Sequence, residues 1–355
     1  MFKILTINPG STSTKIAVFQ NETEVISCTV KHNVQTLNEF KHIIDQFEFR
    51  LQHILNYLEE NNINLSEINA IVGRGGFLRP LQSGIYEVND TMLNDLIECL
   101  NGEHASNLGA VLAFEIASRI KNCKAFIVDP VVVDELQDVA RISGLPQFPR
   151  RSTLHALNHK AMGRKYAEEI GSDYNQLNLV IAHLGGGISV AAHRKGKAID
   201  TNQALDGFGP FSPERAGTMD AGALIRVIYA GIYKQEEIQS LLVGRGGLVA
   251  HLGTNDVKVA YKLAQQGDLH ARIILEAMAY GVGKEIGSML AVLEGKADAV
   301  ILTGGMAHNE LIVNYITKMI HPMCKVIVYP GEDEMMSLAQ AGLRVLKGEE
   351  ESKQY

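Results

Sequence analysis

The sequence predicts an α/β protein that contains two related domains. A strand, a turn of glycine and hydroxyl residues and a second strand are expected over residues 2–19, and the same plan recurs over residues 177–194, about 175 residues later. This recurrence indicates an internal duplication of one α/β unit. Apolar residues at helical spacing predict helices over residues 35–60 and 106–120. A chain of 355 residues is long enough for about two domains.

The remaining elements follow from shorter apolar runs and turn residues. Runs typical of buried strands lie at residues 68–73, 125–129, 298–303 and 324–330. Prolines at 146 and 149 mark an irregular stretch before a helix expected from about residue 152, so we expect a domain boundary near residue 150. A helix over residues 333–347 completes the fold, and the charged tail after it is expected to fray.

Composition and charge exclude several classes of protein. The formal net charge is −7 and the basic residues are scattered, which argues against a nucleic-acid partner. No apolar run approaches the roughly 20 residues that span a bilayer, and the N-terminus lacks the plan of a signal peptide. We therefore expect a soluble cytoplasmic protein with no membrane partner. Its cysteines are expected to be reduced thiols in apolar surroundings, at positions 28, 99, 123 and 324.

The glycine turns are candidate phosphate sites. A loop that cradles phosphate needs backbone N–H groups that point into a concavity, and glycine permits such a backbone. The segments Gly10–Lys15, Gly185–Gly187 and Thr303–Gly305 fit this need. One such turn alone is more simply a tight hairpin, but three together favour phosphate binding. The chain has neither G-x-x-x-x-G-K-[ST] nor a G-x-G-x-x-G that opens a helix, which argues against a P-loop enzyme and a Rossmann dehydrogenase.

Together these segments resemble the acetokinase family, within the superfamily of acetate and sugar kinases, heat-shock chaperone ATPases and actin. Matching positions run in order along nearly the whole chain: Asn8, Gly10, Ser11, Ser13 and Lys15; His155 and His159; His183, Leu184, Gly185 and Gly187; Asp200 and Thr201; Arg215; Thr303, Gly304, Gly305 and Asn309; Asp333 and Glu334. The arginine that the family places before its His-Gly-Gly is absent at its own position, but Arg74 and Arg79 lie within reach. Gly186 replaces an asparagine of the family. These departures are more similar to the butyrate kinase branch than to the acetate branch.

The resemblance implies a fold and a reaction. Two related actin-like, ribonuclease H-like domains would surround a nucleotide cleft. The first would comprise residues 1–150 with 331–355, and the second residues 151–330, which would carry much of the nucleotide site. The implied reaction is reversible phosphorylation of a short-chain carboxylate, with ATP or ADP and Mg²⁺ as cofactors, in a homo-oligomeric enzyme.

The acceptor sets the chemistry that the site must supply. A short-chain acid is ionised at neutral pH, so the reaction needs stabilisation of charge on the phosphoryl oxygens rather than a strong general base. Arginine suits this role because it is always charged and makes bidentate hydrogen bonds to carboxylate and phosphate oxygens. Arg215 is the first candidate, Arg74 the second and Arg79 the third, and a surface ion pair is the alternative for each. Asp129, at the end of a strand, could orient a metal-bound water or the acid.

Three histidines accompany these groups. His155 and His159 are four residues apart and share a face if their segment is helical. A zinc site is disfavoured because no third ligand lies nearby. The resemblance makes His155 a hydrogen-bond donor to the transferring phosphoryl group, whereas His159 is expected to be structural. His183 ends a strand at the second glycine turn and either contacts phosphate or packs there.

Nucleotide and metal ligands are also implied by the resemblance. The expected nucleotide-binding residues are Asn8, Ser11, Ser13, Lys15, His183, Gly185, Gly186, Gly187, Asp256, Gly304, Gly305 and Asn309. Of these, Asp256 would meet the adenine. Magnesium takes oxygen ligands, and the candidates are Glu334 and Asn8. A carboxylate that stabilises the helix N-terminus is the alternative for Glu334, and Glu332 and Asp333 stay open as ligands.

Substrate choice rests on two small replacements. Gly73 and Leu154 stand where acetate kinases typically carry valine and phenylalanine, which predicts a larger pocket. Each buried methylene contributes about 0.8 kcal/mol, so butyrate or a branched acid of four or five carbons is expected. The alternatives are an acetate or propionate kinase, a sugar kinase that would need Asp129 as an essential base, and a nucleotide-dependent binding protein like actin or the heat-shock chaperones.

Overall fold

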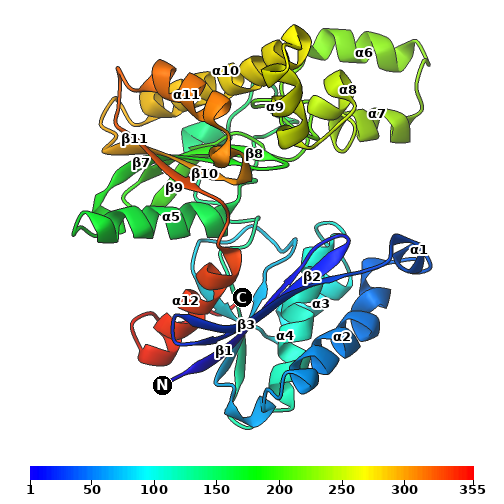
Figure 1. Ribbon diagram of the computed structural model, residues 1–355, viewed down its shortest axis with the longest axis vertical. Helices are drawn as coiled ribbons and strands as arrows, with labels where there is room; N and C mark the ends of the chain where they lie inside the picture. The colour runs from blue at the N-terminus through cyan, green and yellow to red at the C-terminus, as the bar shows by residue number, and fades with distance from the viewer. The chain divides into compact units, whose positions relative to one another are not determined.

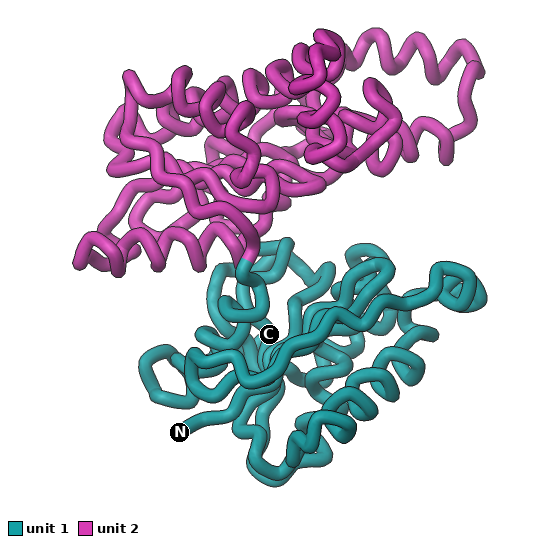
Figure 2. Tube along the Cα trace, in the orientation of Figure 1, with its two compact units in different colours: residues 1–133, 333–355 teal, residues 134–332 magenta.

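The computed structural model describes residues 1–355 as two compact units. Figure 2 shows the first unit, Met1–Val133 with Asp333–Tyr355, in teal and the second, Asp134–Glu332, in magenta. Each unit has its own sheet and its own hydrophobic core. No helix is long and apolar enough to cross a membrane.

The first unit is built on a six-stranded sheet with the order β3-β2-β1-β4-β6-β5. Its strands are β1 (Lys3–Pro9), β2 (Ser13–Gln20), β3 (Thr23–Lys31), β4 (Ala70–Arg74), β5 (Ile85–Glu87) and β6 (Lys124–Val128). Strands β1, β2 and β3 form antiparallel hairpins, whereas β4 pairs in parallel with both β1 and β6. The expected hairpin at the N-terminus is therefore confirmed.

Helices pack on both faces of this sheet (Figure 1). They are α2 (Phe47–Glu60), α3 (Asp90–Ile97), α4 (Leu108–Ser118) and α12 (Glu334–Lys347). The short helix α1 (Val34–Leu37) follows β3 beyond the end of that strand, and 3₁₀ turns lie at Ile43–Gln46, Leu65–Glu67 and Ala105–Asn107. Alternate strand residues face opposite sides. Leu5 and Ile71 join the core with α2 and α4, whereas Ile4 and Val72 approach Gly342 of α12.

The helix expected over residues 35–60 is not continuous. It is broken into α1, the 3₁₀ turn Ile43–Gln46 and α2. Two local caps explain the break. The Asn33 side chain accepts the N–H of Gln35, and the Asp45 carboxylate accepts the N–H of His42 at 2.9 Å, so a second helical segment starts there. The apolar spacing continues across the break, which is why the pattern predicted one helix.

The second unit is built on a five-stranded sheet with the order β11-β10-β7-β8-β9. Its strands are β7 (Asn178–Leu184), β8 (Ile188–Arg194), β9 (Lys197–Thr201), β10 (Ala299–Gly304) and β11 (Val326–Pro330). Strands β7, β8 and β9 are antiparallel, and β10 is parallel to both β7 and β11. Read from the third hairpin strand, β9-β8-β7-β10-β11 repeats the order β3-β2-β1-β4-β6, as expected for a duplicated unit.

The helices of the second unit are more numerous. They are α5 (Ala156–Glu169), α6 (Ala221–Tyr229), α7 (Gln235–Leu242), α8 (Leu248–Leu252), α9 (Val257–Gln265), α10 (Leu269–Val292) and α11 (Glu310–Ile320), with 3₁₀ turns at Asp138–Arg141, Tyr174–Gln176 and Gly305–His308. The long helix α10 packs against α9, α11 and β8 and buries Leu275, Val282 and Ile286 in the core. Helix α6 buries no side chain.

The structure divides the chain at Val133 and Asp134, earlier than the boundary expected near residue 150. The intervening segment belongs to the second unit because it bonds to β9. The backbone N–H of Gln137 donates to the carbonyl of Ile199 at 3.0 Å, the Glu135 carboxylate accepts the N–H of Ala198 at 2.8 Å, and Arg150 pairs with Asp200 at 2.7 Å. The prolines therefore mark a loop inside the unit rather than its edge.

The C-terminal tail is ordered, so the expectation that it frays is wrong. The backbone of Lys353 donates to Ile85 and accepts from Glu87, which adds the tail to the edge of β5. The Tyr355 hydroxyl donates to the Asp95 carboxylate at 2.7 Å and accepts the N–H of Arg79 at 3.0 Å.

Candidate active site

The first glycine turn joins β1 to β2. It is closed by a hydrogen bond of 2.7 Å from the Gly10 N–H to the Ser13 carbonyl. Of the residues predicted to bind phosphate, Ser11 and Lys15 are exposed, and Ser13 is half-buried. Exposed hydroxyl and ammonium groups around a closed turn are free to meet an anionic ligand.

A buried arginine holds this turn in shape. Arg50 of α2 is fully buried, and its guanidinium donates to the carbonyls of Gly10, Ser11 and Ser13 at 3.0–3.2 Å. It also donates to the Thr14 hydroxyl and to the Gln46 side chain. All of these partners are neutral. Burial lowers the pKa of Arg50 to about 10, which leaves it charged at neutral pH.

Sequence reasoning missed Arg50, although a signal was present. Gln46, Arg50 and Ile54 are spaced four residues apart, so the arginine lies on the face that the helix buries. A charged residue on an apolar face needs buried acceptors. Carbonyl oxygens that the turn directs inward provide them.

Asn8, Arg74 and Glu334 form a polar cluster beside the first turn. The Asn8 amide donates to the Glu334 carboxylate at 2.5 Å. Arg74 lies 3.3 Å from both the Asn8 amide oxygen and the Glu334 carboxylate. The structure thus brings together three residues predicted from the sequence, although they are far apart in the chain.

The oxygens of this cluster fit a magnesium ion by their chemistry. The Glu334 carboxylate and the Asn8 amide oxygen are hard donors of the type that Mg²⁺ prefers, and Mg²⁺ commonly completes its shell with waters and substrate phosphates. No group of three or more His, Cys, Asp or Glu side chains is placed to hold a metal. Glu332 and Asp333 have other contacts, since Glu332 pairs with His183 and Asp333 caps α12.

Arg79 and Asp129 are held by structural contacts within the first unit. Arg79 pairs with Asp95 at 2.7 Å, which makes Arg74 the better placed of the two candidate arginines. Asp129 is buried, and its carboxylate accepts the Gly84 N–H at 2.8 Å while its own N–H donates to the Gly84 carbonyl. Its backbone has a φ of 41°, a conformation that non-glycine residues seldom adopt.

Gly73 has a packing role that sequence reasoning did not foresee. A Cβ there would lie 2.1 Å from the carbonyl oxygen of Gly109 in α4. The missing side chain therefore permits close contact between β4 and α4. The expectation that Gly73 also enlarges a substrate pocket stays a prediction. Leu154, the other residue of that argument, is buried in the second unit.

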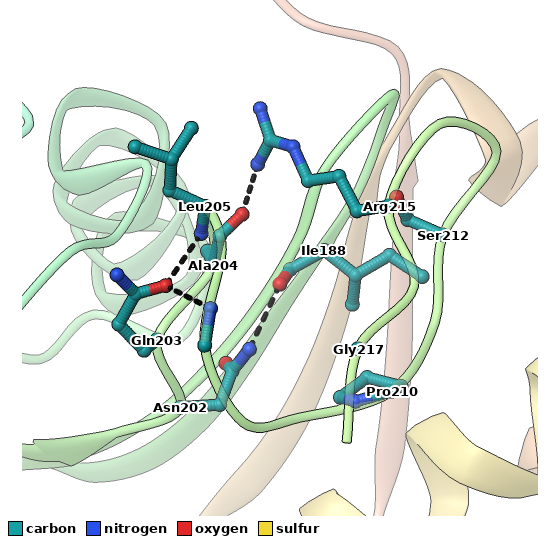
Figure 3. A pocket seen from close by; sticks show the side chains of 10 residues that line it. Ile188, Asn202, Gln203, Ala204, Leu205, Pro210, Ser212, Arg215 and Gly217 are labelled. Carbon is teal, nitrogen blue, oxygen red and sulfur yellow. Dashed lines mark hydrogen bonds between the residues drawn. The ribbon is translucent and has the colours of Figure 1, made fainter. Parts of the chain in front are cut away.

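The second glycine turn joins β7 to β8 and contacts Arg215. A Cβ at Gly187 would lie 1.9 Å from Nη1 of Arg215, so only glycine leaves room for the guanidinium. The Ser212 hydroxyl donates to the Gly186 carbonyl at 2.6 Å and ties the arginine loop to the turn. Figure 3 shows Arg215 and the residues around it, with its guanidinium bonded to the Ala204 carbonyl. This hydrogen bond uses one of the five N–H donors of the Arg215 guanidinium.

His155 and His183 stack beside this turn. Their ring centroids are 4.0 Å apart and the planes differ by 18°. Nδ1 of His183 bonds the Asn158 amide oxygen at 2.9 Å, and Nε2 faces the Glu332 carboxylate at 3.1 Å. Helix α5 begins at Ala156, four residues later than expected from the sequence. His155 occupies its N-cap position and bonds the Ser189 hydroxyl.

A pocket of about 740 Å³ lies beside the same turn. Its lining residues are Gly185, Gly186, Pro213, Glu214, Asn255, Asp256, Val257, Lys258, Tyr261, Gln265, Gly305, Met306, His308, Asn309, Glu310 and Glu332. The volume suits a nucleotide-sized ligand, and Val257, Tyr261 and Met306 provide apolar walls. Gly304 is not among these residues. Its backbone has φ 89° and lies against the backbone of Leu184.

Two of the predicted nucleotide residues cap helices at this pocket. The Asp256 carboxylate accepts the Lys258 N–H at 2.7 Å at the start of α9, and the Asn309 side chain accepts the Ile312 N–H at 3.2 Å at the start of α11. The four-residue 3₁₀ turn Gly305–His308 brings Gly305 and Met306 to the same wall. Helix N-termini favour negative charge, so both helices suit a phosphorylated ligand.

Three buried histidines make stability depend on pH. Burial holds the pKa values of His159 and His193 well below 6.5 and lowers that of His32 to about 4. In the unfolded chain these groups bind protons below about pH 6.5, so the unfolded state gains protons that the native state does not. Stability is therefore expected to fall from pH 6.5 toward pH 4, by up to about 1.4 kcal/mol per pH unit for each histidine.

Urea unfolding at pH 7, 6 and 5 measures this dependence. The His32→Gln variant should take up about one proton fewer on unfolding, so its free energy of unfolding should fall less steeply with decreasing pH. His270→Gln, at the exposed start of α10, should keep the pH dependence of the wild type. A free energy of unfolding that stays constant from pH 7 to pH 5 would contradict the prediction.

The chain matches known proteins over its whole length. Residues 147–351 match the model of the acetokinase family. The chain is 51% identical over 354 residues to a protein named Butyrate kinase 2 from Clostridium acetobutylicum. That alignment covers 100% of this chain and 99% of the other protein.

Solved structures share the fold. The acetate kinase of Porphyromonas gingivalis has a TM-score of 0.77 at 19% identity, and the propionate kinase of Francisella tularensis subsp. tularensis SCHU S4 has a TM-score of 0.76 at 21% identity. Each alignment covers 96% of this chain and 99% of the other. These likenesses confirm the expected fold class.

Proposed function

The chain belongs to the acetokinase family, and from this premise we propose that it transfers the γ-phosphoryl group of ATP to butyrate. The observation that carries the proposal is 51% identity along the whole chain to a butyrate kinase. The reaction joins a carboxylate oxygen to the γ-phosphorus and breaks the bond from that phosphorus to the β–γ bridging oxygen, which leaves with ADP. The products are butanoyl phosphate and ADP, and the reaction is reversible.

Charge stabilisation is the task of the arginines in this proposal. The attacking carboxylate needs no base, because a short-chain acid has lost its proton at neutral pH. Arg215 neutralises charge on the equatorial phosphoryl oxygens, and its bond to Ala204 fixes the direction of the guanidinium. His155 donates a hydrogen bond to the same group. Arg74 is the candidate of the first unit for binding a substrate carboxylate or phosphate.

Asn8 and Glu334 would hold the magnesium ion that accompanies ATP. When bound, Mg²⁺ neutralises phosphate charge and orients the nucleotide. Arg74 lies 3.3 Å from the Glu334 carboxylate, which also accepts a hydrogen bond from the Asn8 amide. The pocket beside α9 and α11 takes the nucleotide, with Tyr261 and Val257 against the base and the turn Gly185–Gly187 near the phosphates.

Two further properties are part of the proposal. The family resemblance favours a homo-oligomer, and Ile225, Ile228 and Tyr229 on α6 leave exposed apolar surface that a second copy could cover. Sedimentation velocity of the wild type and of Ile228→Glu tests it. A cytoplasmic location agrees with the four free cysteines.

The acid preference gives the first test. Acyl phosphate trapped with hydroxylamine is measured for acetate, propionate, butyrate, isobutyrate and isovalerate at fixed ATP. We expect kcat/KM to peak at four or five carbons, and each methylene from acetate to butyrate to raise it by about fourfold, because about 0.8 kcal/mol of burial is gained per methylene. Omission of ATP is the control.

The outcomes separate the alternatives. A peak at acetate would keep the carboxylate kinase and overturn butyrate as the substrate. No product with any acid, in a protein that binds ATP, would overturn the carboxylate kinase itself.

A further inference from the structure

A continuous chain of hydrogen bonds leads from His155 into the core of the second unit. Nδ1 of His155 lies 2.8 Å from the Ser189 hydroxyl, which lies 2.9 Å from Nε2 of His159. Nδ1 of His159 lies 3.1 Å from Nε2 of His193, and Nδ1 of His193 lies 2.8 Å from the Tyr174 hydroxyl. His155 is the N-cap of α5 and His159 lies in that helix, Ser189 and His193 lie in β8, and Tyr174 begins the 3₁₀ turn Tyr174–Gln176.

The inner members are buried and neutral. Ser189, His159 and His193 have no exposed surface, and Tyr174 is 6% exposed. Desolvation holds the pKa values of both inner histidines well below their usual range, and the nearby Lys160 ammonium adds to this effect. Each inner imidazole therefore carries one ring N–H, so it donates through one nitrogen and accepts through the other.

The number of available protons leaves two possible donor directions for this series of hydrogen bonds. The backbone N–H of His155 already donates to the Ser189 oxygen, at 3.3 Å. Since Ser189 has one proton to donate, it donates to one of the two histidines and accepts from the other. Every link must therefore point the same way along the chain, either from Tyr174 toward His155 or from His155 toward Tyr174.

Tyr174 favours the first direction. A phenol is a good donor but a weaker acceptor than a neutral imidazole nitrogen, so Tyr174 donates to Nδ1 of His193. His193 then donates to His159, His159 to Ser189, and Ser189 to Nδ1 of His155. A nitrogen that accepts carries no proton, so the proton of a neutral His155 ring lies on Nε2.

We propose that Ser189, His159, His193 and Tyr174 are positioning residues that fix His155 as its Nε2–H tautomer, with Nε2 as the donor to the transferring phosphoryl group. The role of His155 rests on the proposed kinase function, whereas the tautomer does not. His159, expected from the sequence to be structural, thereby acts on the chemistry through Ser189. The relay also holds the ring in place beside His183, on which it stacks.

The test changes Tyr174, the end of the hydrogen-bond relay that is farthest from His155. Tyr174→Phe removes the hydroxyl and keeps the ring that packs against Gly163. Tyr166→Phe is the matched control, since Tyr166 is a buried tyrosine of the same cluster with no bond to the relay. Ser189→Ala breaks the first link, and Ser189→Thr restores a hydroxyl.

Two readouts are needed. The ¹⁵N shifts of the His155 ring, assigned by loss of the signal in His155→Gln, report which nitrogen carries the proton. Acyl phosphate formation reports kcat and KM. We expect Tyr174→Phe to convert the Nε2–H signature to a mixture of tautomers and to lower kcat about tenfold, with KM values within twofold. Ser189→Ala should lower kcat about 100-fold, Ser189→Thr should recover most of it, and Tyr166→Phe should change neither readout.

Each contrary outcome overturns the relay. An unchanged ¹⁵N signature in Tyr174→Phe would show that the far end does not set the tautomer. An unchanged kcat would show that the tautomer has no bearing on the reaction. If the wild type phosphorylates no acid, the kinase proposal fails, and the relay stands or falls on the ¹⁵N spectra alone.

Discussion

Arg215→Lys is expected to lower kcat by about 10³-fold while KM for ATP changes severalfold at most. Removal of one preoriented donor from a charge-stabilising site typically costs 10²- to 10³-fold, and loss of an arginine that contacts a transferring phosphoryl group costs about 10³- to 10⁵-fold. Lysine keeps the charge but has no planar fork, so it cannot hold the Ala204 carbonyl and bind two phosphoryl oxygens at once. Steady-state kinetics of acyl phosphate formation measure the loss.

A second variant tests the same arginine without altering it. Gly187→Ala would place a Cβ 1.9 Å from Nη1 of Arg215, so the guanidinium must move away from its present position. We expect kcat to fall about 100-fold while the melting temperature changes little, because the end of a side chain moves more easily than backbone. Arg226→Lys, on the exposed face of α6, is the control and should retain full activity.

Full activity in Arg215→Lys would remove Arg215 from the transition state. Loss in Gly187→Ala combined with normal activity in Arg215→Lys would instead assign the effect to the glycine turn.

Arg50→Met is expected to lower the free energy of unfolding of the first unit by about 3 kcal/mol, because each buried acceptor that loses its donor costs about 1–3 kcal/mol. The variant leaves the carbonyls of the first turn and the Gln46 side chain without their donor. It also removes a buried positive charge, bonded to neutral partners, from beneath the turn predicted to bind phosphate. The KM for ATP is therefore expected to rise about tenfold.

Arg119→Met provides the matched control for this prediction. Arg119 follows α4 in the same unit, but it is exposed and pairs only with Glu115, so its loss should cost about 0.5 kcal/mol or less. Urea unfolding and ATP titration by calorimetry give the two quantities. If Arg50→Met unfolds at the wild-type urea concentration, Arg50 does not stabilise the turn. If stability falls but ATP binds as before, its charge does not reach the ligand.

Local patterns predicted the strands and turns of this protein well. The hairpins around Gly10 and Gly186 were identified because apolar alternation and small turn residues are neighbours in the sequence. The cluster of Asn8 and Glu334 came from the family resemblance, since 326 residues separate the two. Within the second unit, the resemblance also identified His155, His183 and Arg215, which lie around one turn.

Contacts between distant segments were beyond these patterns. No local pattern marks Tyr174 and His193, because their hydrogen bond joins a 3₁₀ turn to a strand residue 19 positions later. In the sequence, Gly73 suggested only that a side chain had been removed from a pocket wall. In the structure, the absence of a side chain leaves room for the backbone of α4. The tail after residue 348 looked disordered because its charge is local, while its partners Ile85 and Asp95 lie far upstream.

The discontinuity of the first unit has a consequence for synthesis of the protein. Its sheet is made from the first 133 residues, but α12, which packs against β1, β2 and β4, is made last. While the ribosome is still translating residues 334–347, the surface around Ile4, Ala17 and Phe19 has no cover. The second unit is continuous and can complete its core first. The sheet of the first unit is thus made early but covered late, and termination of synthesis before residue 334 would leave its apolar face open to chaperones and proteases.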